Sequence, residues 1–178
     1  MVQIITDSST LHTVEEANAL GVETLSLCVN INELEGRDLQ MDMKDFYERI
    51  RKGQIPRSSQ PPIGEVVDMF DKYKDSDIIN ITIADGLSGT YQSACAVKEM
   101  SENRERITVF NCKTLCGPHR YLVEKAQQMK EKGYSAAEIL EWLEEKRERT
   151  ESFLIPQDFG FLKRGGRLTP VPATLSDF

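Results

Sequence analysis

The chain has 178 residues, of which 39% are hydrophobic and 29% are charged, a balance typical of a soluble globular protein. Its 22 basic and 29 acidic residues give a net charge of −7, which argues against nucleic-acid or anionic-membrane binding because these surfaces need basic patches. No apolar run in the sequence approaches the roughly 20 residues of a membrane helix. Four irregularly spaced cysteines favour a reducing, cytoplasmic compartment.

The predicted elements alternate between strands and helices. In chain order we expect a strand at 2–6, a short helix between 13 and 21, a strand at 23–31, helices at 43–52 and 62–73, a strand at 77–84, a helix ending near 100, a strand at 107–111, helices at 118–131 and 135–149, and a strand that starts at 153–155. Capping boxes begin the helices at Thr13 and Ser135. Turns are expected at Asn30, Asn32 and Gly36.

The stretch 77–84 contains four isoleucines, which indicates a strand buried on both faces of a parallel sheet. Strands that alternate with helices predict a three-layer α/β/α fold with a mainly parallel sheet. The composition changes near residue 150, and the tail from 160 shows no periodicity. We therefore expect an N-terminal α/β domain over residues 1–150 and the beginning of a second, smaller α/β domain over 151–178.

Hydroxyl-bearing residues gather at three places where a ligand could bind. Asp7-Ser8-Ser9 and Ser88-Gly89-Thr90 follow predicted strands, and ligands of open parallel sheets bind beyond the carboxyl ends of strands. Hydroxyls and free N–H groups at a helix start suit a carboxylate or phosphate. Helix capping explains both clusters equally simply. A third cluster, Ser58-Ser59-Gln60-Pro61, lies in the predicted loop 53–62 and is either a binding loop or an ordinary turn.

Two other chemistries are disfavoured. Gly86–Thr90 resembles a nucleophile elbow, but Thr90 stands where the second glycine is required. The bases available to such a serine are His12 and His119, for which surface and cap positions are the simpler prediction. Cys112, Cys116 and His119 lack the fourth ligand of a structural zinc site, so we expect no metal and interpret the thiols as core residues.

Lys163-Arg-Gly-Gly-Arg167 is the one concentrated basic element of this acidic chain. Arg164 and Arg167 could hold a phosphate or an acidic partner through guanidinium forks. A turn between two surface strands is the alternative interpretation.

Four motifs together resemble the DegV family of bacterial fatty-acid-binding proteins, in order and spacing over essentially the whole chain. They are Ile4-Ile-Thr-Asp7-Ser-Ser, Pro56-Arg-Ser-Ser-Gln-Pro61, Leu87-Ser-Gly-Thr-Tyr-Gln-Ser-Ala94 and Phe161-Leu-Lys-Arg-Gly-Gly-Arg167. The third is the most specific. The resemblance implies a two-domain α/β protein that encloses a long-chain fatty acid in an apolar tunnel and holds its carboxylate by hydroxyls.

By motif match, the resemblance implies headgroup contacts at Ser58 and Ser88, with Ser59, Gly89 and Thr90 close by. It further implies a carrier without catalytic residues or a cofactor, which presents the bound fatty acid to a separate fatty acid kinase. Arg164 and Arg167 would then contact that partner or the new phosphate.

The sequence departs from the family pattern in three places. Ser58 replaces a threonine but keeps the hydroxyl, and the segment 111–117 carries Asn and Cys where the family has Asp and Ser. Family members are also considerably longer, so we expect this chain to be truncated. Two alternatives to a fatty-acid carrier follow: an enzyme that acts on a small anionic substrate at the same strand ends, and a fragment that binds no ligand.

Overall fold

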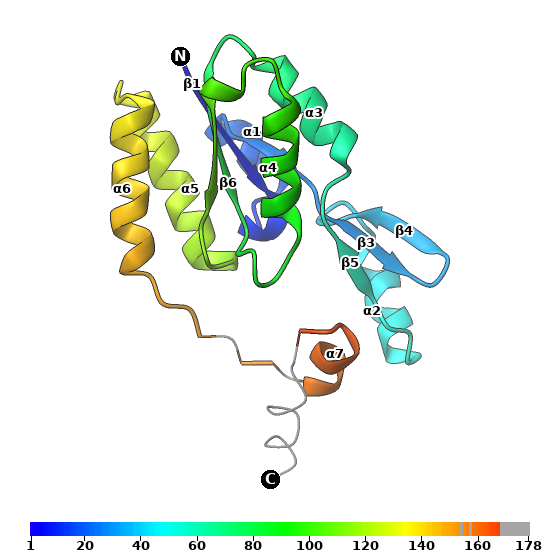
Figure 1. Ribbon diagram of the computed structural model, residues 1–178. Coiled ribbons are helices and arrows are strands. Elements are labelled where there is room, and N and C mark those ends of the chain that lie inside the picture. The colour runs from blue at the N-terminus through cyan, green and yellow to red at the C-terminus, as the bar shows by residue number, and fades with distance from the viewer. Residues whose placement is uncertain (154, 157, 168–178) are drawn as a thin grey trace.

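The computed structural model describes residues 1–153, 155, 156 and 158–167. Its centre is a four-stranded parallel sheet with the strand order β2-β1-β6-β7 (Figure 1). The strands are β1 (Val2–Asp7), β2 (Glu23–Leu25), β6 (Asp77–Thr82) and β7 (Ile107–Asn111). β1 lies between β2 and β6, with Asp7 paired to Leu25 on one side and Thr6 paired to Ile81 on the other.

Helices cover both faces of this sheet (Figure 1). They are α1 (Val14–Leu20), α3 (Ile63–Lys72), α4 (Thr90–Met100), α5 (Cys116–Glu131) and α6 (Ala136–Glu148). One core contains Ile4, Ile79 and Ile81 together with residues of α5 and α6, and the other contains Ile5 and Ile78 with residues of α3 and α4. Because strand side chains alternate between faces, the isoleucine-rich strand supplies both cores, and the predicted three-layer α/β/α fold is confirmed.

The helix ends follow their local sequence signals. The predicted capping boxes are both present, Thr13 with Glu16 at α1 and Ser135 with Glu138 at α6. Gly21 ends α1 in a left-handed conformation, with a φ of 72° that glycine adopts without steric cost.

A second sheet of three antiparallel strands, in the order β4-β3-β5, was not predicted. Its strands are β3 (Cys28–Ile31), β4 (Leu34–Arg37) and β5 (Arg57–Ser59), and α2 (Met43–Arg51) lies between β4 and β5 in the chain. The predicted single strand at 23–31 was therefore wrong: the chain leaves the parallel sheet after Leu25 and enters the small sheet at Cys28. Asn30 and Gly36 lie in strands rather than turns, and the predicted loop 53–62 contains β5.

The end of the described chain also differs from the prediction. Phe153 and Ile155 are not in a strand, and Leu154 lies outside the described residues. The short helix α7 (Phe159–Arg164) occupies part of the stretch for which no periodicity was found, and Asp158 caps it by accepting a hydrogen bond from the Gly160 N–H at 2.7 Å. Residues 168–178 of that stretch lie outside the described residues.

Candidate functional site

A cavity of about 550 Å³ lies where the carboxyl ends of the parallel strands meet the small sheet and α7. Four of the five predicted ligand-binding residues line it, namely Ser58, Ser59, Ser88 and Gly89. Its remaining lining is Leu27, Gln60, Ile83, Leu87, Leu115, Leu162 and Arg167. Five aliphatic side chains with a few hydroxyls at one place are typical of a site for an apolar ligand that has one polar end.

Ser88 and Thr90 form a hydroxyl pair at the start of α4. The Ser88 Oγ lies 2.8 Å from the Thr90 Oγ1 and accepts a hydrogen bond from the Thr90 N–H at 3.3 Å. Thr90 is buried and does not line the cavity, so it lies beside the predicted contact Ser88, as expected of a residue close to the headgroup, without facing the cavity itself. Its hydroxyl instead holds Ser88, which faces the cavity.

Gly89 lies where the side chain of Gln60, in the loop after β5, comes close to the start of α4. A Cβ atom at this position would collide with the Gln60 Oε1. The Gln60 Nε2 donates a hydrogen bond to the Ser93 Oγ at 3.0 Å, which fastens the loop to the first turn of α4. The lack of a side chain at Gly89 therefore permits the contact that brings Ser58 and Ser59 beside Ser88.

The serines of the cavity come from two different sheets. Ser58 and Ser59 belong to β5, an edge strand of the small sheet, where they pair with Val29 and Cys28 of β3. Ser88 follows β6 of the parallel sheet. A ligand headgroup held by both sets would thus bridge the two sheets.

The two arginines of the basic element lie in different environments. Arg167 lines the cavity, and its Nη2 lies 3.4 Å from the Leu87 carbonyl oxygen. Arg164 does not line the cavity, and its guanidinium lies over the Phe161 ring at 4.9 Å from the centroid. Arg164 is the last residue of α7 and Arg167 lies three residues beyond it, so a helix precedes the basic element where the alternative interpretation expected a strand.

His119 is completely buried in α5, contrary to the predicted surface or cap position. Its Nδ1 lies 2.9 Å from the Ser9 Oγ, and its Nε2 lies 3.1 Å from the Thr6 Oγ1 and 3.2 Å from the Ile81 carbonyl oxygen. Burial lowers the pKa of His119, opposed by the negative charge of Asp7. The ring is therefore held neutral, and both nitrogens are engaged away from Ser88.

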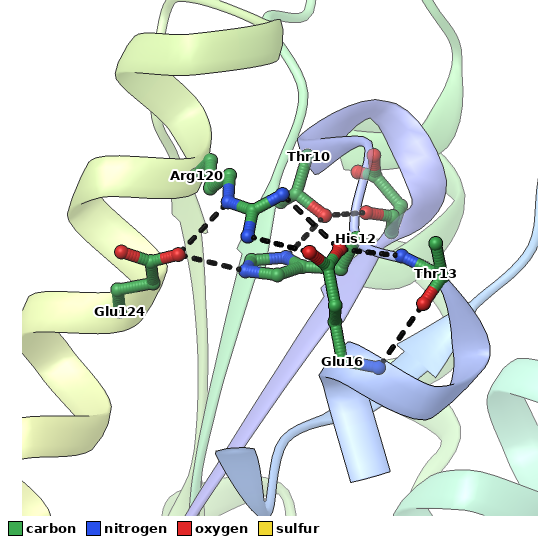
Figure 2. Close-up of polar contacts among 7 residues, drawn as sticks. Thr10, His12, Thr13, Glu16, Arg120 and Glu124 are labelled. Atoms are coloured by element: carbon green, nitrogen blue, oxygen red, sulfur yellow. Dashed lines mark hydrogen bonds and ion pairs between the residues drawn. The ribbon is translucent and has the colours of Figure 1, made fainter. Parts of the chain in front are cut away.

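His12 is also buried and belongs to a polar cluster that joins α1 to α5 (Figure 2). Its Nδ1 lies 2.9 Å from the Thr10 Oγ1, and its Nε2 lies 3.2 Å from the Glu124 Oε1. Arg120 donates to Glu124 at 2.8 Å and to Glu16 at 3.2 Å. Burial alone would raise the pKa of Glu124, but the hydrogen bonds from Arg120 and His12 lower it.

The buried thiol of Cys112 has a structural partner. The Cys112 Sγ donates to the Thr114 carbonyl oxygen at 3.2 Å, and burial raises its pKa to about 12. Burial also raises the pKa of Cys116. In the described ranges no three His, Cys, Asp or Glu residues come together in a way that could hold a metal ion. None of the helices described there is long and apolar enough to cross a membrane.

The sequence interpretation missed the apolar walls of the cavity. Ile83 directly follows β6, and Leu27 and Leu115 lie a few residues beyond β2 and β7. The rule that ligands bind beyond the carboxyl ends of parallel strands could have identified Ile83. Leu162 could not be found in this way, because α7 was not predicted.

Known proteins resemble this chain in sequence and in fold. A family model described as an uncharacterised protein of the DegV family matches residues 1–178. Protein DegV of Bacillus subtilis is 30% identical over 177 residues, which cover 97% of this chain but 63% of that protein. The chain thus spans under two thirds of the length of that curated relative.

Two solved structures share the fold. The crystal structure of DegV from Bacillus subtilis, described as a fatty acid binding protein, superposes with a TM-score of 0.85 at 31% identity and covers 98% of this chain and 64% of that one. A DegV family protein from Thermus thermophilus, whose structure is described as showing fatty acid binding, gives a TM-score of 0.83 at 27% identity, with 98% and 63% covered.

Proposed function

Because the chain belongs to the DegV family, we propose that its cavity binds a long-chain fatty acid. The observation that carries the proposal is that Ser58, Ser59, Ser88 and Gly89 line a single cavity whose other walls are mainly leucine and isoleucine. The description of two relatives as fatty-acid-binding proteins supports it.

The apolar walls supply the affinity in this proposal. Each buried CH₂ group contributes roughly 0.8 kcal/mol, so a long acyl chain gains more from Leu27, Ile83, Leu87, Leu115 and Leu162 than its headgroup does from hydroxyls. The cavity volume of about 550 Å³ falls within the range of small-molecule sites, roughly 300–1,000 Å³.

The serines supply the specificity for a carboxylate. A buried carboxylate without hydrogen-bond donors would be protonated or expelled. The hydroxyls of Ser58, Ser59 and Ser88 can donate, and the N–H groups at the start of α4 add a favourable dipole. Among the residues that the structure describes, Arg167 is the one cationic residue in the lining of the cavity.

We further propose that the chain is a carrier, which hands its fatty acid in the cytoplasm to a separate kinase. No residue of this chain has a catalytic role in that scheme, and Arg167 steadies the new phosphate or contacts the partner. Arg167→Ala is accordingly expected to slow phosphorylation of the bound fatty acid more than it weakens fatty-acid binding. Binding assays and phosphorylation assays on the same preparation measure the two effects.

The first experiment measures bound lipid directly. The chain is purified from bacteria, denatured and extracted with organic solvent, and the extract is analysed by mass spectrometry. Near-stoichiometric fatty acid is the expected result. An extract without fatty acid, together with no binding of added palmitate, would overturn the proposal.

A variant then tests the headgroup site. Ser88→Ala removes one donor and is expected to raise the Kd for palmitate about tenfold, since a lost hydrogen bond to a charged group costs ~1.5–3 kcal/mol. Ser101→Ala is the control, because Ser101 lies at the opposite end of α4 and donates to the Val97 carbonyl oxygen. An unchanged Kd in Ser88→Ala would remove Ser88 from the site.

A further inference from the structure

The turn Asp7–Thr10 at the end of β1 consists of four polar residues that are all buried. Burial of a polar group costs free energy unless the group is hydrogen-bonded. Where each of these side chains makes its hydrogen bonds therefore indicates what the turn does. The four side chains divide into two pairs with different partners.

One pair, Ser9 and Thr10, anchors the turn to α5. The Ser9 hydroxyl contacts His119. The Thr10 hydroxyl contacts His12, which is joined to Glu124 (Figure 2). Neither histidine lines the cavity. The Thr10 contact and the hydrogen bond from the Ser9 N–H to the Asp7 Oδ1 do not involve the Ser9 hydroxyl, so they remain when that hydroxyl alone is removed.

The other pair, Asp7 and Ser8, holds the backbone of two residues that line the cavity. The Asp7 Oδ2 accepts a hydrogen bond from the Ile83 N–H at 2.7 Å. The Ser8 Oγ accepts one from the Leu27 N–H at 3.0 Å and donates to the Asp38 Oδ2 at 3.0 Å. Ile83 and Leu27 both line the cavity.

The topology of the sheet explains why one turn reaches both walls. β1 lies between β2 and β6, and its last backbone pairs are Asp7 with Leu25 and Thr6 with Ile81. Leu27 and Ile83 each lie two residues beyond those pairs. The side chains of Asp7 and Ser8 thus continue the hydrogen bonding of the sheet past the end of its backbone ladder.

We propose that Asp7 and Ser8 are positioning residues of the cavity. They hold Leu27 and Ile83 at a fixed separation and so set which acyl chains the cavity accepts. The choice of a fatty acid as the ligand rests on the proposed function. The positioning role itself concerns only the backbone N–H groups of Leu27 and Ile83.

Two adjacent serines of the turn provide a matched test. Ser8→Ala releases Leu27, whereas Ser9→Ala removes a hydroxyl of similar burial that faces His119 instead. The Kd is measured for palmitate and for the shorter laurate. We expect Ser8→Ala to raise the palmitate Kd about tenfold and to reduce the preference for palmitate over laurate, because the longer chain depends on more of the wall. Ser9→Ala is expected to change both Kd values less than twofold.

Equal losses of palmitate affinity in Ser8→Ala and Ser9→Ala would overturn the inference, because a turn with only a structural role would affect both variants equally. An unchanged preference for palmitate over laurate in Ser8→Ala would also overturn it.

Amide hydrogen exchange measured by NMR tests the same positioning role without a ligand. Exchange at Leu27 should accelerate in Ser8→Ala, and exchange at Ile83 should accelerate in Asp7→Ala, which removes both carboxylate oxygens, while Ser9→Ala leaves both protected. Unchanged exchange at Leu27 and Ile83 in those variants would refute the positioning role. A wild-type chain that binds no palmitate would refute the proposed function and leave this exchange test intact.

Discussion

Gly89 shows how one missing side chain shapes the site. It lies between Gln60 and the first turn of α4, in the place where a Cβ atom would collide with the Gln60 amide. Its backbone is not in the left-handed region, with a φ of −71°, so the close approach rather than the conformation requires glycine.

Gly89→Ala is therefore expected to push the Gln60 loop away from α4 and to weaken palmitate binding at least as much as Ser88→Ala. Gly86→Ala is the matched control, because a Cβ at Gly86 meets nothing within 4 Å. Titration calorimetry with palmitate compares the two. Equal palmitate affinities of Gly89→Ala and Gly86→Ala would contradict this prediction and would show that the Gln60 loop can move without an effect on binding.

His119 makes the stability of the fold depend on pH. Burial lowers its pKa in the folded chain, whereas the unfolded chain has an ordinary histidine pKa of about 6.5. The unfolded state therefore takes up a proton first as the pH falls. The stability that neutral His119 contributes is present above about pH 6.5 and is lost as the pH falls toward its lower folded pKa.

We expect the free energy of unfolding to decline between about pH 7.5 and pH 5.5, above the range where most carboxylates titrate. His119→Gln should be less stable at pH 7.5 but should lose less on acidification. Urea denaturation at several pH values provides the measurement. His12→Gln, which keeps His119, should retain the decline. The same slope in His119→Gln and wild type would contradict the assignment.

At the level of elements, the capping boxes can be tested separately from the cavity. Ser135 accepts a hydrogen bond from the Glu138 N–H, and the Glu138 carboxylate accepts one from the Ser135 N–H at 2.8 Å. Hydrogen bonds from Ser135 lower the pKa of Glu138. The box begins α6, which lines no part of the cavity.

Ser135→Ala should lower the free energy of unfolding by about 1 kcal/mol and leave the palmitate Kd unchanged. Urea denaturation and calorimetry on the same protein separate the two quantities. A change in Kd would mean that α6 is coupled to the cavity. Thr13→Ala, which removes the equivalent hydroxyl at α1, should have a similar effect on stability.

The parallel sheet and its helices could be predicted because each depends on local sequence. The isoleucines of β6 and the capping boxes of α1 and α6 specify their elements without distant partners. β5 has no such pattern: Arg57, Ser58 and Ser59 are all exposed and form a strand through pairing with β3. The hydroxyls of the site were recognisable from their motifs, but the walls at Leu27 and Leu162 depend on how separate elements meet.

At the scale of the whole molecule, the cavity is enclosed by parts that are far apart in the chain. Ile83, directly after β6, comes from the end of the parallel sheet, Ser58 comes from the small sheet, and Leu162 comes from α7. None of the residues of α7 is buried, so this helix adds little to the core and its apolar contact lies at the cavity.

Leu162→Asp should raise the palmitate Kd about tenfold or more, because a carboxylate would stand in the apolar wall. The free energy of unfolding should change by less than about 0.5 kcal/mol, as for a surface substitution. Phe159→Asp on the same helix is the control, because Phe159 is half exposed and does not line the cavity. Equal effects of the two substitutions on affinity would show that α7 acts only through its general position.

The small sheet has little core of its own. Ile31 is the one buried residue in its three strands, and α2 has none. A headgroup held by Ser58 and Ser88 together would act as a cross-link between this weakly packed sheet and the well-packed parallel one. By mass action, a ligand at a hundred times its Kd stabilises the state that binds it by about 2.7 kcal/mol. The small sheet would then be more rigid in the chain that holds a ligand than in the chain without one. A partner that contacts the small sheet could thereby distinguish the ligand-bound chain from the ligand-free chain without contacting the acyl chain.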